Sequence, residues 1–430
     1  MKPSELEYFD LPTQQEPIVI RDSWWIETLT HPYINRLRLV KQTGNTSIAF
    51  EGTSHSRYEH SASVGFLVSK FLPEKIDHGL RAKAIFSGLC HDIGHGPYSH
   101  SFEKFILPKI GVSNWKHEAM SELLTERLYE DLSEPPFDAK DFKSIFGNGG
   151  RNFNTEIFYL IANKASGFDM DRFDYLRRDS FYTKVQLPLN FDRLKYGVCW
   201  VNDFNGKDYS LCFEEAVIPD LAAMLKYRFK LFDTVYLNPQ TIGMDLLTSD
   251  LLVECEPILN LREKVQSIDS FITLTDDIVP SLFTHKDLSK RASMLVQRIQ
   301  EQDIYDFIGS WIILNTGKEK LTKQQINELE ATLEKQIKAS LDHVAHPDEL
   351  EVQFFLINGL QDCHPEKILV KTSNGKIDYL PDTGLDSSCF DPVRKHFVMI
   401  YSKTLGKAES IAAEMAKFAG QMSHILASVN

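Results

Sequence analysis

A short run near the start of the chain constrains its fold more than any other feature. It reads Leu89-Cys90-His91-Asp92-Ile93-Gly94-His95-Gly96-Pro97-Tyr98-Ser99-His100, with three histidines and one aspartate among small or apolar residues. Neutral imidazoles and a carboxylate together suit a borderline or hard divalent cation. Two glycines and a proline break a helix here, so we expect His95 and His100 to turn back toward the ion held by His91 and Asp92. A helix end with satisfied histidines is the alternative, and it explains one histidine better than it explains this cluster.

The composition is that of an ordinary globular protein. The chain has 430 residues, 43% hydrophobic and 25% charged, enough for one large domain with an appendage or for two domains. No apolar run is long enough to span a bilayer, and the first residues lack a signal-peptide core. The six cysteines include no Cys-x-x-Cys pair, which favours a reducing, cytoplasmic location over a disulfide scaffold. A formal net charge of −13 argues against strong nucleic-acid binding but allows a small anionic ligand.

Hydrophobic periodicity predicts a mainly helical chain. Apolar residues at helical spacing follow His60, and further helices are expected at 320–344 and at about 407–426. The glycine-rich stretch 147–154 is expected to be a surface loop.

Strands are expected to be few. Asn205-Gly206 and Asn374-Gly375 each lie between short β-prone segments, and each predicts a hairpin. We expect residues 397–401 to add a strand to the second hairpin. The predicted fold class is therefore mainly α, with a helical core and small β-hairpins over residues 1–250 and a smaller α+β C-terminal lobe over residues 251–430. The boundary is softest near 250–285, and no site residues are expected after it.

Two histidines outside the central run are candidates for chemistry. His60 opens an amphipathic helix on its apolar side, where a lone histidine is more often a core residue. The pair His91-Asp92 downstream makes it a candidate metal ligand. His117 precedes Glu118, a weak signal alone, although a histidine oriented by an acid is a suitable general acid for a phosphate ester.

The segment around residue 175 places polar side chains on one helical face. Asp171, Tyr175 and Asp179 are spaced i, i+4 and i+8. A solvated charged helix would show the same spacing, but the aromatics and leucine inside the segment weaken that interpretation.

Two other segments have an ordinary structural explanation. Arg228, Phe232 and Tyr236 also share a helical face, and an aromatic stripe of this kind is usually core. Residues 35–44 would, on their own, form a basic amphipathic helix that ends at Gly44.

Taken together, these motifs resemble the HD phosphohydrolase superfamily, named for its His-Asp pair, and in particular its dNTP triphosphohydrolase branch. The matching stretches are Arg36-Leu37-Arg38-Leu39-Val40-Lys41-Gln42-Thr43-Gly44, Arg57-Tyr58-Glu59-His60-Ser61, the central run, Asp169-Met170-Asp171-Arg172-Phe173-Asp174-Tyr175-Leu176-Arg177-Arg178-Asp179, and Arg228 to Tyr236. The resemblance runs by motif from about Pro17 to Tyr236 and more loosely to the end. Some members of the branch carry a SAM domain before the HD domain; we expect none here, because the N-terminus is too short.

The resemblance implies a role for each matched residue. The implied metal ligands are His60, His91, Asp92 and Asp171, holding Mn, Mg, Fe or Zn. The implied catalytic residues are His95, His100, Glu103, His117 and Glu118, with His117 or His95 as the proton donor and Glu103 as the partner of His117. The expected substrate-binding residues are Gln42, Arg57, Lys164, Arg172, Tyr175, Asp179, Arg228, Phe232 and Tyr236.

The substrate contacts implied by the resemblance are specific. Gln42 would read the 3′-hydroxyl, the basic residues would hold the polyphosphate, and the Tyr236 ring would leave no room for a 2′-hydroxyl. Phe232 stands where the best-known member has histidine, so one polar contact is missing.

The implied function is metal-dependent hydrolysis of deoxynucleoside triphosphates to deoxynucleoside and inorganic triphosphate, in a homo-oligomer that is a dimer or tetramer. An HD-type phosphodiesterase or phosphatase acting on another nucleotide would need the metal ligands but not the sugar-binding set. A non-catalytic nucleotide sensor would be expected to lose a ligand, and none is lost. An HD-type di-iron oxygenase would need further ligands that the sequence does not identify.

Regulated members of the branch bind activating nucleotides between subunits, and this chain departs from their pattern. Asp22-Ser23-Trp24-Trp25-Ile26 stands where they carry a D-P-[IV]-H-G-type stretch, and Thr30 replaces an acid. Gln302 and Asp306 stand where the activated relative has basic residues, leaving Arg193 as the one basic candidate. We therefore expect no activation by guanine nucleotides.

Overall fold

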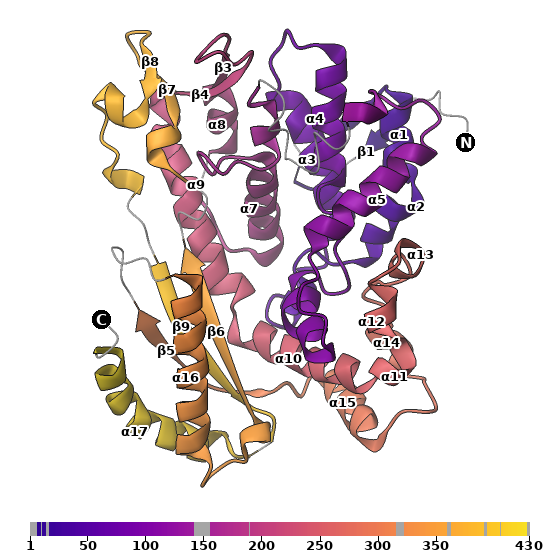
Figure 1. Cartoon of the computed structure of the whole chain (residues 1–430), viewed down its shortest axis with the longest axis vertical. Helices are drawn as coiled ribbons and strands as arrows, with labels where there is room; N and C mark the ends of the chain where they lie inside the picture. The colour runs from indigo at the N-terminus through magenta and orange to yellow at the C-terminus, as the bar shows by residue number, and fades with distance from the viewer. Residues whose placement is uncertain are drawn as a thin grey trace.

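The computed structural model describes residues 7–9, 11–13, 17–141, 155–188, 190–314, 322–358, 363–390, 394–404 and 406–427. It is mainly α with small sheets, which confirms the predicted fold class. In Figure 1 the helices fill the upper and right parts of the molecule, and a three-stranded sheet with two helices lies at the lower left. The loop expected at 147–154 lies outside the described residues.

The helical part surrounds a large hydrophobic core. Its helices are α1 (Ser23–Thr30), α2 (Pro32–Asn35), α3 (Arg57–Phe71), α4 (His78–Cys90), α5 (His117–Asp131), α7 (Met170–Thr183), α8 (Phe191–Gly197), α9 (Ile218–Leu231) and α10 (Pro239–Glu254). Shorter helices follow: α11 (Glu256–Leu259), α12 (Leu261–Lys264), α13 (Ile268–Phe271), α14 (Ile278–Leu282) and α15 (Lys290–Gln300). The buried residues of this core extend from Leu11 to Tyr401 along the sequence.

The start of helix α3 and its packing against α4 each follow from particular residues. Ser56 and Glu59 form a capping box at its N-terminus, which satisfies free backbone N–H groups there. Gly65 lies so close to α4 that an added Cβ would meet Leu89 Cδ2 at 2.3 Å. This close approach brings His60 beside the residues that follow α4.

The sheets confirm both predicted hairpins. Strands β3 (Val198–Val201) and β4 (Ser210–Glu214) pair antiparallel, as do β7 (Leu369–Lys371) and β8 (Ile377–Tyr379). β4 also pairs parallel with β7, so the two hairpins form one four-stranded sheet. A separate pair joins β1 (Glu7–Phe9) to β2 (Ile18–Ile20).

The strand expected at 397–401 exists but does not join the second hairpin, so that prediction was wrong. β9 (Arg394–Ser402) lies between β5 (Asp306–Leu314) and β6 (Leu350–Asn358) in a three-stranded antiparallel sheet. The reason is burial on both faces. Phe397, Met399 and Tyr401 join the large core, whereas Val398 and Ile400 join a second, smaller one. A strand buried on both faces needs long partners, which the three-residue β8 is not.

The smaller core is completed by the last two long helices. Both α16 (Lys323–Leu341) and α17 (Ala408–Ala427) match the predicted helices. Leu333 and Ile411 are fully buried between these helices and the sheet. Within the described part of the chain, no helix combines the length and apolar character that a membrane crossing requires.

Residues 35–44 do not form the amphipathic helix that the pattern alone would favour. A 3-10 turn, η1 (Arg36–Leu39), follows α2, and Val40 is then extended. The backbone N–H of Lys41 donates to Asp276 Oδ2 at 2.9 Å. This distant contact, together with the burial of Arg36, diverts the chain from a helical course.

The central run also leaves its helix earlier than expected. α4 ends at Cys90, before either glycine. Gly94 serves a different purpose: a Cβ there would lie 2.3 Å from both His117 O and Ser121 N of α5. Since only glycine permits this contact between backbones, Gly94 allows α5 to carry His117 to the central run.

We predict that Gly94→Ala lowers the free energy of unfolding by about 1–3 kcal/mol or more, the usual cost of overpacking. Denaturant titration of the purified chain measures the change. Gly79→Ala is the control, because within 4 Å its added Cβ would meet only the Asp77 side chain, at 3.2 Å. Equal stability of Gly94→Ala and the wild type would contradict the close contact between α5 and the central run.

Candidate functional site

The four residues expected to bind metal converge from three helices. His60 lies on α3, His91 and Asp92 directly follow α4, and Asp171 lies in the first turn of α7. His60 Nε2 is 3.1 Å from Asp171 Oδ1 and 3.7 Å from Asp92 Oδ2. His91 Nε2 is 3.5 Å from Asp92 Oδ1 and 3.7 Å from Asp171 Oδ1. We call these four residues the His-Asp cluster.

In each imidazole of the cluster, Nδ1 contacts an oxygen of a residue outside the cluster. His60 Nδ1 lies 2.8 Å from Asp174 Oδ2, and His91 Nδ1 lies 2.8 Å from the carbonyl oxygen of Gly88. The two Nε2 atoms are buried and make no hydrogen bond among the described residues. Metal-binding histidines characteristically show this division of roles, so the residues present fit a divalent cation.

Electrostatics at the cluster favour a cation. Burial lowers the pKa of His60, but Asp171 and Asp174 more than offset it and raise the pKa to about 10. Burial likewise opposes ionisation of Asp92, yet His91 and Arg57 hold the pKa of that carboxyl well below its usual range. The negative potential that attracts a proton to His60 also attracts a divalent cation, which competes for the same nitrogen.

His95 borders the His-Asp cluster as the sequence suggested, but both His95 and His100 are grouped with His117. Their ligand atoms gather with those of His117, all within 4.8 Å of one another. The His95 and His117 rings stack with centroids 4.0 Å apart. The physical reason is the contact at Gly94, which brings α5 against the central run. His95 Nε2 still lies 3.5 Å from Asp92 Oδ1, so the two groups of residues are adjacent.

His117 is held by a carboxylate. Its Nδ1 lies 2.8 Å from Glu103 Oε2, and Lys116 contacts the other oxygen of the same carboxylate. Burial raises the pKa of Glu103, but hydrogen bonds from His117 and Lys116 outweigh it and lower the pKa to about 2. Glu118 is exposed and lies 3.4 Å from the same imidazole nitrogen, so Glu103 is the partner better shielded from solvent.

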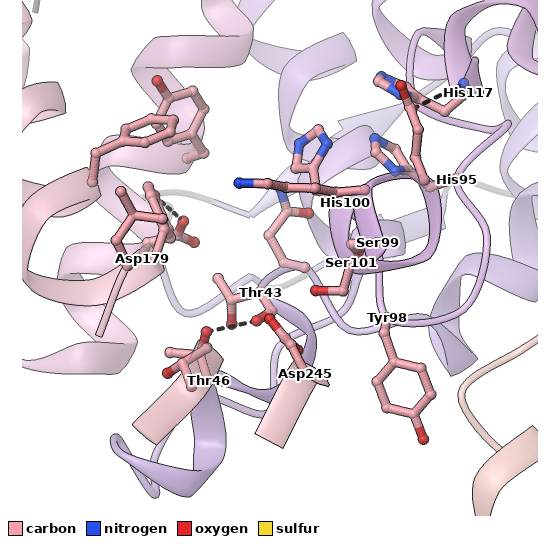
Figure 2. Close-up of a pocket in the computed structure, with 18 of the residues that line it drawn as sticks. Thr43, Thr46, His95, Tyr98, Ser99, His100, Ser101, His117, Asp179 and Asp245 are labelled. Atoms are coloured by element: carbon pink, nitrogen blue, oxygen red, sulfur yellow. Dashed lines mark hydrogen bonds and ion pairs between the residues drawn. The ribbon is translucent and has the colours of Figure 1, made fainter. Parts of the chain in front are cut away.

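A cavity of about 690 Å³ joins the cluster to the other predicted residues. Figure 2 shows its histidine group at one end, Asp179 across from it, and Asp245 with Thr46 at another end. The predicted substrate residues that line the cavity are Gln42, Arg57, Arg172, Tyr175, Asp179, Arg228, Phe232 and Tyr236. Lys164 is exposed and is not among the lining residues.

Asp179 is fixed between two side chains. Tyr236 donates from its hydroxyl to Asp179 Oδ2 at 2.5 Å, and His55 Nε2 lies 2.7 Å from Oδ1. The Tyr236 ring packs against Phe232, with centroids 5.0 Å apart, and Tyr175 lies beside it. An acceptor beside an aromatic wall is suited to a hydroxyl-bearing sugar.

The three arginines that line the cavity each contact other groups of the protein. Arg57 pairs with Asp92 through one guanidinium nitrogen and donates through Nε to Ser99 Oγ at 2.7 Å. Arg228 donates to the carbonyl of Asn358 in β6 at 2.9 Å. Arg172 Nη1 lies 3.6 Å from Asp169 Oδ2. An anionic ligand reaching Arg57 would therefore share it with Asp92.

The central run is clamped by two distant residues. Arg36 donates to the carbonyls of Ile93 and His95 at 2.8 and 2.7 Å, and to Leu274 O at 2.8 Å. Asp276 Oδ1 accepts from the Tyr98 N–H at 2.6 Å. This bond supports a left-handed conformation, since Tyr98 and Ser99 have φ of 58° and 59°.

The sequence reasoning missed several of these contributors. Asp174, His55 and Asp276 each hold a predicted site residue or the loop that carries it. Of these, only Asp174 had a usable signal, because it lies three residues after Asp171 on the same helix. No site residues were expected after about residue 285, yet Phe355 lines the cavity and Asn358 contacts Arg228. That expectation was wrong because β6 folds back against α9.

Several known proteins are similar to this chain in sequence. A search against protein-family models finds no match. The chain is similar to the deoxynucleoside triphosphate triphosphohydrolase SAMHD1 homolog of Dictyostelium discoideum, with 29% identity over 306 residues covering 68% of this chain and 58% of that protein. An HD domain-containing protein of Acanthamoeba polyphaga mimivirus is 29% identical over 321 residues, 68% of each chain. The human deoxynucleoside triphosphate triphosphohydrolase SAMHD1 is 23% identical over 397 residues, 79% of this chain and 61% of that protein.

The chain thus spans little more than half of the Dictyostelium protein. The similarity extends over most of this chain. These relatives support the assignment of the chain to an HD-domain family similar to the dNTP triphosphohydrolases.

Proposed function

We propose that the chain hydrolyses deoxynucleoside triphosphates to deoxynucleoside and inorganic triphosphate in a metal-dependent reaction. The observation that carries the proposal is the meeting in one cavity of the His-Asp cluster, three arginines and the Asp179–Tyr236 pair. The activity for which the SAMHD1 relatives are named supports the same reaction class.

The His-Asp cluster would hold a divalent cation through His60, His91, Asp92 and Asp171. Such a cation supplies charge neutralisation at a phosphoryl oxygen and lowers the pKa of a water molecule. The carboxylate of Asp174 and the carbonyl of Gly88 engage Nδ1 of the two imidazoles, so each Nε2 would be available to hold the ion.

The chain's own residues supply the remaining steps. Arg172 and Arg228 would hold the polyphosphate, with Arg57 shared between substrate and Asp92. Water adds to the α-phosphorus, the bond from phosphorus to the 5′-oxygen breaks, and His117 donates a proton to that oxygen. The proton released by the attacking water passes to solvent, from which His117 is reprotonated. Glu103 keeps the His117 imidazole oriented, as a general acid requires.

Selection for deoxyribose would come from Tyr236. Its hydroxyl is fixed on Asp179 and its ring is supported by Phe232, so the ring cannot easily move aside for a 2′-hydroxyl. Gln42, which lines the same cavity, would bind the 3′-hydroxyl. Its side-chain oxygen is buried and makes no hydrogen bond among the described residues.

A phosphodiesterase acting on another nucleotide is the second candidate. The observation that favours it is the His95–His100–His117 group, whose ligand atoms are close enough to hold an ion of their own beside Asp92. Two-metal hydrolases use such adjacent sites. Elemental analysis distinguishes the candidates, since two ions per chain with turnover of a phosphodiester would favour this alternative.

We predict that Asp92→Asn weakens metal binding at least about 100-fold and abolishes hydrolysis, because an anionic ligand is lost at the cluster centre. Metal content by elemental analysis and dNTP turnover are measured together, with the exposed Asp269→Asn as the control. A variant that keeps full metal content and full turnover would show that Asp92 is misassigned.

Two substitutions at Tyr236 distinguish the contribution of its ring from that of its hydroxyl. Tyr236→Ala is expected to reduce the preference for dATP over ATP by about tenfold or more, because space opens at C2′. Tyr236→Phe keeps the ring and should retain the preference, although its bond to Asp179 is lost. The ratio of kcat/KM values for the two nucleotides is the measurement, and an unchanged ratio in Tyr236→Ala would reject the steric role.

We also predict that guanine nucleotides do not activate the enzyme. Arg193, the one basic candidate, is occupied by an ion pair with Asp220 at 3.2 Å, and Asp306 would repel a triphosphate. GTP or dGTP is added to a dATP hydrolysis assay, and molar mass is followed by light scattering. A large rise in rate with a shift to a higher oligomer would contradict the prediction.

A further inference from the structure

One end of the cavity carries two ionisable side chains that the proposed reaction does not use. Asp245 of α10 is 5% exposed and lines the cavity, as does Lys104 of the short π-helix η3 (Phe102–Ile106). Figure 2 shows Asp245 and Thr46 on the side of the cavity away from His117. A buried carboxylate is costly without polar partners, so its position facing a cavity calls for an explanation.

The chain itself connects the expected sugar site to this end of the cavity. Gln42 is followed by the short helix that carries Thr46, and Tyr236 is followed by α10, which carries Ile242 and Asp245. All five residues line the same cavity. A deoxynucleoside triphosphate whose sugar lay between Gln42 and Tyr236 would direct its phosphates toward the His-Asp cluster. Its base is then directed along these two segments, toward Asp245.

The two ionisable groups offer complementary hydrogen bonding. Asp245 Oδ1 accepts from Asn45 Nδ2 at 2.8 Å, and Ser101 also donates to this carboxylate, which leaves acceptor capacity toward the cavity. The Lys104 ammonium lies 3.8 Å from the centroid of the Phe355 ring. Among the described residues, Lys104 forms no ion pair within 4.0 Å.

We propose that Asp245 and Lys104 read the nucleobase of the substrate and favour guanine. The inference rests on the proposed function and deepens it, because it names the preferred substrate as dGTP. Neither residue acts on the phosphates, so both are determinants of specificity.

The hydrogen-bond donors and acceptors of the four bases indicate guanine as the base that Asp245 and Lys104 would bind best. Guanine presents N1–H and the exocyclic amine side by side as donors to one carboxylate, and its O6 and N7 as acceptors for one ammonium. Adenine and cytosine each offer a single amine to a carboxylate. Thymine offers one N–H between two carbonyl oxygens, which a carboxylate repels. We therefore expect dGTP to bind best and dTTP worst.

The test measures binding and turnover separately. Dissociation constants of all four dNTPs are determined by calorimetry on the full chain at about pH 8. Burial raises the pKa of Asp245 to about 7, despite its bonds to Asn45 and Ser101, so the carboxylate is ionised under these conditions. Wild-type protein should favour dGTP over dTTP, and Asp245→Asn should reduce that ratio by about tenfold, the scale of one bidentate contact to a base.

A second variant and a matched control complete the test. Lys104→Met should also reduce the ratio, and it provides the answer if Asp245→Asn does not fold. Glu254→Gln makes the same carboxylate-to-amide change in α10, beside Ser289 and away from the cavity, and should leave the ratio unchanged. An unchanged ratio in a folded Asp245→Asn or Lys104→Met variant would overturn the inference. Absence of dNTP turnover in the wild type would instead overturn the proposed function, since the binding ratio is measured independently.

Discussion

The buried carboxylate of Asp174 is the interaction on which the site depends. It contacts His60 Nδ1 and the Ser63 hydroxyl of α3, and it pairs with Arg178 one turn further along α7. Burial raises the pKa of this carboxyl, but Arg178 and His60 outweigh it and hold the pKa well below its ordinary value. Removing one member of such a buried set leaves its partners uncompensated, at a cost of about 3–5 kcal/mol. The set therefore locks the orientation of His60 while it joins the helices that carry His60 and Asp171.

A second constraint acts on the loop after α4. The carbonyls of residues 93 and 95 are held by Arg36, and the N–H of Tyr98 is held by Asp276. Two consecutive non-glycine residues in the left-handed region are unfavourable locally, so their conformation depends on these bonds. Through Ser99, which contacts Arg57 and the carbonyl of Lys41, the loop geometry is transmitted to the cavity.

The cavity is also a meeting point of distant parts of the sequence. The His-Asp cluster and the expected sugar contacts come from the first 240 residues, whereas Phe355 and Asn358 come from β6. Arg228 illustrates the consequence, because its guanidinium is oriented by a β6 carbonyl and lies over Phe232. Phosphate binding by Arg228, as proposed above, would therefore depend on the docking of the C-terminal sheet against α9.

Much of the local structure could be predicted from the sequence. The hairpins at Asn205-Gly206 and Asn374-Gly375, and the helices that carry His60 and Asp171, follow from turn chemistry and from periodicity. These are short-range properties, set by steric and hydrophobic preferences within a few residues. The partner of β9 and the fate of residues 35–44 could not be predicted in this way, because each was decided by contacts made across long separations.

The same division applies to the candidate site. The sequence determined which residue types were available, since histidines and aspartates in this pattern suit a divalent cation. Tertiary structure decided how they were grouped: His95 and His100 join His117, because Gly94 lets α5 approach the loop backbone. It also decided that Asp245 and Lys104 share a cavity with the His-Asp cluster. Side-chain chemistry is fixed by the local sequence, whereas the distance between side chains is fixed only when the whole core packs.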